Sequence, residues 1–271
     1  MKSFHIRPSL ALRPYIDRLW GWESSVGEPV QLPTLLPGTG AELYFHYGQP
    51  FDFVDSIGTV SRSEAGHLVC LRGTTMSLLP NTNIGFIAVR FKVGMLGRFT
   101  PMSAASLIDQ PRSAETIWGA AANQLIDQLM GTQTQVGRLR LIQKFLIERL
   151  QQDSTDGLIE QAMQQQYRAR GALSIDNLAA KAGLGRRQFE RRWKSFSAQT
   201  PQDTQGLCRF QHTVRRLALD PSAQIVDAIL LHGYYDQAHF IHDFGKRVGL
   251  TPKRFIQALR DKTHFYNTSL A

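Results

Sequence analysis

The chain repeats part of its own sequence at an offset of 51 residues. The segment 189–201, FERRWKSFSAQTP, aligns with 240–252, FIHDFGKRVGLTP, and both keep two aromatic residues four positions apart and a final Thr-Pro. Each copy follows a short amphipathic segment that ends in a glycine, Gly183 in the first and Gly233 in the second. Glycine there favours a left-handed turn between two helices. The repeat therefore predicts two helix-turn-helix units in one chain.

We expect these units at about 175–194 and 225–246. The second helix of each has one apolar face, because its apolar residues recur every three or four positions. These inward residues are Phe189, Trp193 and Phe196 in the first unit and Phe240, Phe244 and Val248 in the second. Asp236 is the expected N-cap of the latter helix. The candidates for contact with nucleic acid are Arg186, Arg187, Glu190, Arg191, Lys194, Gln237, Ala238, His239, His242 and Lys246.

His239 and His242 lie three residues apart, so they share one face of the predicted helix. Such a pair could also hold a metal ion or lie on an ordinary solvated surface. The aligned positions of the first copy carry no histidine, and two histidines alone lack the third ligand that zinc usually takes. We therefore predict no metal site and favour contact with DNA over a plain solvated surface.

Nearly all of the net charge lies in the C-terminal part of the chain. Residues 1–156 hold 14 Lys and Arg against 13 Asp and Glu, a net charge of +1, whereas residues 157–271 hold 17 against 9, a net charge of +8. This asymmetry indicates a polyanionic partner for the second part, either nucleic acid or an anionic membrane. No apolar run is long enough to cross a membrane, and Cys70 and Cys208 form no paired motif, so we expect a cytoplasmic protein.

The N-terminal part is predicted to contain an antiparallel sheet. Short β-type runs bounded by Gly, Pro or Asn occur at 41–48, 67–73 and 84–92. In the first run Leu43 and Phe45 alternate with Tyr44 and His46, so the two pairs should lie on opposite faces. Several short strands at this spacing are typical of a barrel or sandwich. The predicted fold class is thus α+β, with an N-terminal antiparallel β barrel or sandwich (cupin-like) plus helices, and a C-terminal all-α domain.

From about residue 103 onward the periodicity is helical. An apolar stripe in the segment 134–150 consists of Val136, Leu139, Ile142, Phe145, Leu146 and Leu150. This stripe is wider than one small domain needs, so we expect the 134–150 helix to form a homodimer interface. The polar stretch 151–157, QQDSTDG, is the expected boundary between a first domain, 1–155, and a DNA-binding domain, 156–271.

The C-terminal motifs resemble those of the AraC/XylS transcriptional regulators. The resemblance covers roughly 170–262 and rests on LSIDNLAAKAGLGRRQFERRWKSFSAQTP, the bridging RFQHTVRRLAL, and DAILLHGYYDQAHFIHDFGKRVGLTPKRF. The segments LRPYIDRLWGWE, LLPGTGAELYFHYG and AVRFKVGMLGRF also look like the sensor domain of one branch of that family. The resemblance implies double-stranded DNA as partner, two recognition helices joined by a long helix, and RNA polymerase as a further partner if the protein activates transcription.

The resemblance also implies a small-molecule effector, of unknown identity, bound by the first domain. The candidate effector-binding residues are Trp20, Trp22, Glu42, Tyr44, His46 and Arg90. We predict no cofactor, no catalytic residue and no membrane partner. Two alternatives stay open: a DNA-binding regulator whose first domain only dimerises or meets a protein partner, and a cupin-type enzyme hidden in the barrel.

Individual side chains of the recognition helices suit different parts of DNA. Arg187 and Arg191 can make bidentate contacts with guanine, and Glu190 can accept a hydrogen bond from cytosine. Phosphate contacts are expected from Arg186, Arg192, Lys194 and Lys246. Two positions depart from the family pattern: Gly185 stands where a Ser cap is usual, and His242 stands where an Arg is usual.

Overall fold

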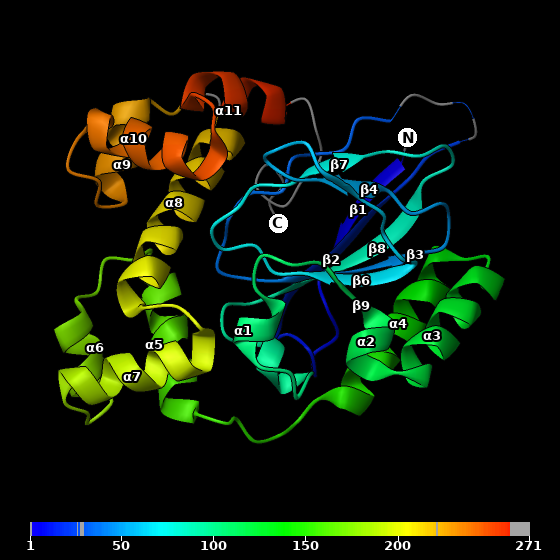
Figure 1. Ribbon diagram of the computed structural model, residues 1–271, viewed down its shortest axis with the longest axis horizontal. Helices are drawn as coiled ribbons and strands as arrows, with labels where there is room; N and C mark the ends of the chain where they lie inside the picture. The colour runs from blue at the N-terminus through cyan, green and yellow to red at the C-terminus, as the bar shows by residue number, and fades with distance from the viewer. Residues whose placement is uncertain (1, 26, 28–29, 221, 261–271) are drawn as a thin grey trace.

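The computed structural model describes residues 2–25, 27, 30–220 and 222–260. Figure 1 shows a β-rich domain beside a group of helices, with helix α8 (Pro201–Leu219) connecting the upper and lower parts of that group. The predicted α+β fold class, with an antiparallel sheet domain followed by an all-helical domain, is confirmed. In the described part of the chain, no helix is long and apolar enough to span a membrane.

The first domain contains two antiparallel sheets. The larger has the order β1-β2-β8-β3-β6-β9, and the smaller has the order β5-β4-β7. The strands are β1 (Lys2–Ile6), β2 (Ile16–Glu23), β3 (Glu42–His46), β4 (Asp52–Val54), β5 (Val60–Ser61), β6 (Gly66–Val69), β7 (Ser77–Leu79), β8 (Gly85–Phe91) and β9 (Arg112–Ser113). The central strand β8 is buried along its whole length, because both of its faces are covered.

Each face of the larger sheet has its own apolar core. Leu43 and Phe45 lie in the core between the sheet and the helices that follow it. Tyr44 lies in the other core, between the two sheets, and the His46 ring contacts Phe51 there at a centroid distance of 4.7 Å. The predicted alternation along β3 is therefore confirmed. The core between the two sheets is called the barrel interior below.

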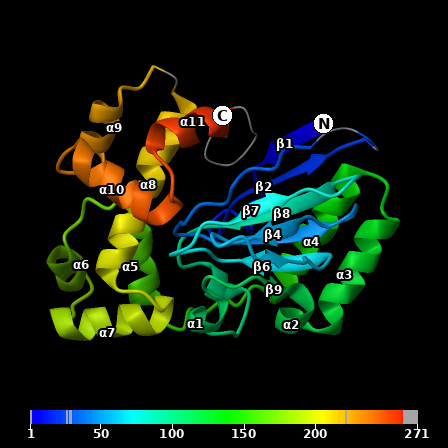
Figure 2. The ribbon, with the colours of Figure 1, turned by 45° about the horizontal axis from the view of Figure 1, so that its top comes forward.

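Helices cover the outer face of the larger sheet, as Figure 2 shows for α3 and α4. These elements are η1 (Leu96–Arg98), α1 (Ala104–Leu107), α2 (Ala114–Trp118), α3 (Ala120–Gly131) and α4 (Gln135–Arg149). The apolar stripe of α4 packs against the first domain itself: Leu139 and Leu146 are 7% and 0% exposed. The expectation that this stripe forms a dimer interface is wrong, because the sheet already covers it. Val136 is the exception, and it is 57% exposed.

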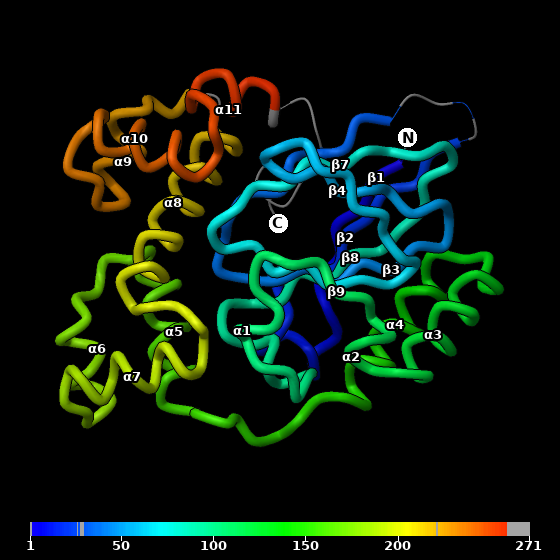
Figure 3. Tube along the Cα trace, in the orientation of Figure 1, coloured from blue at the N-terminus to red at the C-terminus, as the bar shows by residue number. Residues whose placement is uncertain are grey.

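The chain then runs along the edge of the molecule from α4 to the second domain, as the tube in Figure 3 shows. The helices of that domain are α5 (Gly157–Arg168), α6 (Ile175–Lys181), α7 (Arg186–Ser197), α8, α9 (Ile225–Leu231), α10 (Gln237–Val248) and α11 (Pro252–Arg260). The pairs α6/α7 and α9/α10 lie where the repeat predicts helix-turn-helix units. Gly183 and Gly233, at the turns, have φ angles of +66° and +78°, the left-handed conformation that glycine favours.

Candidate nucleic-acid interface and effector region

The first recognition helix, α7, turns its aromatic residues inward. Phe189 and Trp193 are both fully buried, and the Trp193 indole donates a hydrogen bond to the Thr204 hydroxyl at 3.2 Å. The opposite face is exposed and carries Arg187, Gln188, Arg191, Lys194 and Ser195. Gly185 begins the helix without a side-chain cap, as the sequence predicts.

Three of the charged residues of α7 make ion pairs. The Arg186 guanidinium contacts Glu190 at 3.0 Å and Asp176 at 2.9 Å, so these three side chains form a cluster at the start of the helix. Arg192 makes two hydrogen bonds, at 2.6 and 2.8 Å, with the carboxylate of Asp156. This pair ties α7 to the N-cap of α5, and the phosphate contact expected of Arg192 stays a prediction that competes with it.

The second recognition helix, α10, is capped by Asp236, whose carboxylate accepts a hydrogen bond from the His239 amide at 2.7 Å, as predicted. Phe240 and Phe244 are fully buried. The exposed residues of this helix include Gln237, Ala238, His239, His242 and Lys246. One ring nitrogen of His239 already has a partner, because its Nδ1 accepts a 3.4 Å hydrogen bond from the Tyr235 amide.

The bridging helix α8 begins at Pro201 with a capping box formed by Thr200 and Asp203. Its Arg209 lies over the Tyr234 ring and donates to the Gly233 carbonyl at 3.3 Å. Through these contacts Arg209 holds the turn of the second unit in place. The two units are thus joined by a helix with a continuous buried face, whose members are Leu207, Phe210, Val214 and Leu217.

Exposed residues on these faces that the sequence reasoning missed include Gln188 and Ile241. Gln188 lines a surface depression together with Gly185, Arg186, Arg187 and Arg191. Ile241 is 43% exposed on α10. The helical spacing could have predicted this exposure, because Gln188 precedes the inward Phe189 and Ile241 follows the inward Phe240, which places both side chains off the buried face.

The two histidines of α10 do not form part of a metal-binding cluster in the described residues. Within that part of the chain, no three His, Cys, Asp or Glu side chains come together in a way that could hold a metal ion. Cys70 and Cys208 are both buried free thiols.

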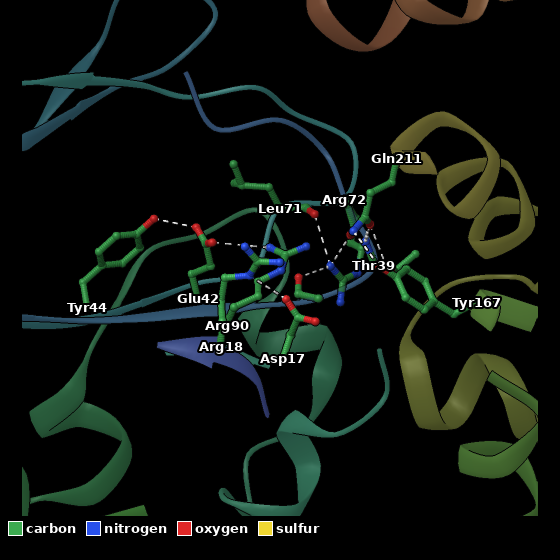
Figure 4. A network of polar contacts seen from close by, with 12 residues as sticks. Asp17, Arg18, Thr39, Glu42, Tyr44, Leu71, Arg72, Arg90, Tyr167 and Gln211 are labelled. Atoms are coloured by element: carbon green, nitrogen blue, oxygen red, sulfur yellow. Dashed lines mark hydrogen bonds and ion pairs between the residues drawn. The ribbon is translucent and has the colours of Figure 1, made fainter. Parts of the chain in front are cut away.

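The candidate effector-binding residues lie in or beside the barrel interior. Trp20, Trp22, Tyr44 and His46 are fully buried in contact with one another or with Phe86. Glu42 and Arg90 form a buried pair at 3.8 Å, and Glu42 also accepts a 2.5 Å hydrogen bond from the Tyr44 hydroxyl. Figure 4 shows this network and the polar contacts that continue to the second domain, where the Gln211 amide oxygen accepts from the Thr39 hydroxyl at 2.9 Å.

Two neighbouring histidines give the barrel interior an unusual polar character. The rings of His46 and His67 are stacked with centroids 5.1 Å apart. Burial lowers the pKa of His46 well below its ordinary value, and the nearby His67 lowers it further. Burial lowers the pKa of His67 to about 4, although its hydrogen bond to the Glu64 carbonyl acts in the opposite direction. Both rings are therefore neutral at pH 7.

Comparison with known proteins agrees with this geometry. Residues 178–258 match the family described as a helix-turn-helix domain, and residues 4–113 match a domain of unknown function, DUF6597. Among solved structures, ToxT from Vibrio cholerae has a TM-score of 0.52 at 8% identity, covering 88% of this chain and 97% of ToxT. ToxT bound to (E)-4-(8-methylnaphthalen-1-yl)but-3-enoic acid has the same TM-score at 9% identity, with the same coverage. A search of curated proteins found no match.

Residues 178–258 thus form a helix-turn-helix domain of the AraC type. This match supports DNA binding, and none of the comparisons supports the alternative of a cupin-type enzyme. The chain departs from the AraC/XylS pattern at His242, which is exposed on α10 and replaces a usual Arg. An imidazole at this place offers fewer donors than a guanidinium, so the two recognition helices differ in what they can read.

Proposed function

We propose that the regulator binds two successive major grooves of duplex DNA, one with α7 and one with α10. The observation that carries this proposal is the pair of exposed polar faces on two helices joined by the single helix α8. Each helix has a fully buried aromatic face, so its polar face is free for the partner. Two such helices in one chain suit half-sites about one helical turn, ~34 Å, apart on one side of the DNA.

Within this proposal the exposed side chains divide by role. Arg187 and Arg191 read guanine through bidentate hydrogen bonds, and Gln188 lies beside them for adenine. Lys194 and Lys246 contact phosphates as point charges. Arg186 is held by its ion pairs at the start of α7, where it faces phosphate while Glu190 orients it.

Binding of the full-length regulator to its selected operator is expected to weaken steeply as salt concentration rises. Each phosphate that a cation neutralises releases counterions, so log K should fall linearly with log salt, with a slope of roughly −0.9 per contact. Lys194→Gln should weaken binding to all sequences alike and reduce the slope by about 1. Fluorescence anisotropy at several salt concentrations measures both.

The matched control for this experiment is Lys144→Gln. Lys144 is an exposed lysine on α4, far along the chain from the recognition helices, and its side chain is 76% exposed. Its substitution should leave both affinity and slope unchanged. A folded wild-type protein that fails to bind any duplex at low salt would contradict the proposed function, and equal effects of the two substitutions would contradict the role of Lys194.

We infer that a small-molecule effector binds in the barrel interior and modulates this activity. Buried polar groups normally have hydrogen-bond partners. Within the described residues, however, both ring nitrogens of His46, Nε2 of His67 and the Trp22 indole nitrogen have none. A ligand with donors and acceptors would satisfy them. The carboxylic acid named with the ToxT structure supports an effector for this fold, while leaving its identity here open.

A metabolite that binds only the folded protein is expected to raise its melting temperature. Thermal-shift screening of a metabolite library should find such a compound, and its effect should be lost in His46→Phe, which removes two unpartnered nitrogens from an aromatic cluster. His242→Phe, on the exposed surface, is the control and should keep the shift. If no compound acts through His46, the alternative becomes preferable, in which the first domain only dimerises or binds a protein.

Three further parts of the proposal concern assembly. We propose a homodimer, with an interface other than the buried stripe of α4, and contact with RNA polymerase if the regulator activates transcription. We also place the domain boundary at 155/156, supported by the start of α5 at Gly157 with Asp156 as its cap. Sedimentation of the full chain reports the oligomeric state.

A further inference from the structure

The second recognition helix carries an apolar patch, Ala238, Ile241 and Gly245, within its exposed face. These residues are spaced by three and four positions, so they share one side of α10. Ile241 is 43% exposed, and Ala238 is exposed as well. The offset of 51 that aligns the two units makes Ile241 the equivalent of Glu190. The same offset makes Gly245 the equivalent of Lys194. The two recognition helices therefore present different chemistry at equivalent positions.

The arginine of α10 does not belong to this exposed face. Arg247 lies on the far side of the helix from the patch, where its guanidinium pairs with Asp243 at 2.9 Å and lies over the Phe210 ring at 5.4 Å. Its side chain is only 19% exposed. The bidentate contact with guanine that Arg187 and Arg191 offer on α7 is therefore not offered by an arginine on α10.

The fold gives no reason for the glycine in the patch. Gly245 lies inside α10 with helical backbone, and an added Cβ would meet no described atom within 4 Å beyond the neighbouring backbone of the helix. A glycine inside a helix lowers stability relative to alanine, because it loses more backbone freedom on folding. Glycine also lets the backbone come closer to a partner than other residues do. Gly245 therefore indicates a close approach of α10 to what it binds.

Thymine is the base whose major-groove edge matches an apolar patch. Among the four bases of DNA it alone presents a methyl group there. Cytosine presents an amino donor at its edge, and Ile241 has no side-chain acceptor for that donor. Adenine and guanine present acceptors, which an aliphatic side chain also leaves without a partner.

We propose that α10 selects thymine: Ile241 and Ala238 contact thymine 5-methyl groups, and Gly245 lets the helix backbone lie close to the base edges. This inference rests on the proposed binding of α10 in a major groove and names the bases that it selects there. The α7 equivalent of Ile241 has other contacts, since Glu190 accepts hydrogen bonds from Arg186 at 3.0 Å and from Gln202 at 3.3 Å. The methyl contact is thus specific to the second recognition helix.

The experiment uses the full-length protein and the operator duplex that the wild type selects. Each thymine is replaced singly by deoxyuridine, which keeps the hydrogen-bonding groups and removes the methyl group. At a thymine that the patch contacts, Kd should rise by up to about fourfold, equivalent to the ~0.8 kcal/mol of one buried methylene-sized group. Ile241→Ala should bind the thymine operator more weakly and lose the uracil penalty at the position that Ile241 contacts.

Two outcomes of this scan would overturn the inference. One is an operator bound equally well with uracil at every thymine. The other is a set of uracil penalties that is the same in the wild type and in Ile241→Ala. Both leave DNA binding itself intact. A wild-type protein that selects no operator would contradict the proposed function and this inference together, so the two failures are distinguishable.

Gly245→Leu tests the close approach. Leucine is the better helix former, so the melting temperature without DNA should rise by about 2 °C. Operator binding should nevertheless weaken by roughly tenfold, the loss of one good base contact, because the side chain holds the helix away from the bases. A purely structural glycine would not give this combination. A folded Gly245→Leu that binds as tightly as the wild type would refute the close approach.

Gly131→Leu is the matched control for this variant. Gly131 ends α3 in the first domain, and a Cβ added there also meets nothing within 4 Å. Its substitution should leave operator binding unchanged. The uracil scan on the wild-type protein needs no variant, so it decides the inference even where Gly245→Leu does not fold.

Discussion

Arg187→Ala and Arg191→Ala are each expected to weaken binding to selected operator DNA by ~1–3 kcal/mol, the discrimination that a good bidentate base contact provides. Each should also relax the preference at one base pair. His242→Ala should cost less, because an imidazole has fewer N–H donors than a guanidinium and Ala238 on the same helix offers only a methyl contact. The two recognition helices should therefore contribute unequally to sequence reading.

Binding-site selection on the three variants checks this asymmetry. His242→Arg is the complementary test: it adds a permanent cation and a bidentate donor, so binding should tighten and become more sensitive to salt. Loss of sequence preference in His242→Ala, together with normal preference in Arg191→Ala, would show that the reading faces have been assigned the wrong way round.

The free energy of unfolding is expected to fall steeply as the pH drops from about 6.5 to 4. In the unfolded chain a histidine has a pKa near 6.5, so it takes up a proton in this range. In the folded protein the pKa of His67 is about 4 and that of His46 is also lowered well below the ordinary value, so both stay neutral. The unfolded state therefore binds more protons, and stability present above pH 6.5 is lost on acidification.

The size of this effect is large for a single side chain. A shift of one pKa unit corresponds to about 1.36 kcal/mol, so His67 alone contributes ~3 kcal/mol of pH-dependent stability between pH 6.5 and 4. Burial also lowers the pKa values of His5, His212 and His232 to about 4, which adds to the loss. Thermal unfolding at pH 7.5, 6 and 5 measures the trend.

His46→Phe separates this effect from general acid denaturation. Neither nitrogen of His46 has a partner in the described residues, so an aromatic ring without nitrogens should fit the same cluster. This variant should lose less stability than the wild type between pH 6.5 and 5, while His242→Phe should follow the wild type. Identical pH profiles for the wild type and His46→Phe would contradict the assignment.

Much of the second domain could be predicted from the sequence because its signals are local. The repeat, the inward aromatic stripes, the turn glycines Gly183 and Gly233, and the Asp236 cap each depend on residues a few positions apart. The structure places the helices, the buried aromatics and the cap accordingly. The alternation along β3 could be predicted for the same reason, since strand periodicity is also a local property.

Only the tertiary structure decided which partner each of these side chains has. The apolar stripe of α4 had the pattern of an interface between two copies of the chain, but the sheet of the same domain covers Leu139 and Leu146. The spacing of apolar residues along a helix shows that one face is buried, and it does not show which element buries that face. Arg192 has the chemistry of a phosphate contact, and only the structure shows that Asp156, 36 residues away, pairs with it. Local residue patterns determined where the helices form and which of their faces are apolar. Contacts between residues far apart in the chain depend on packing geometry. The packing of the two domains therefore determined which helix faces stay exposed.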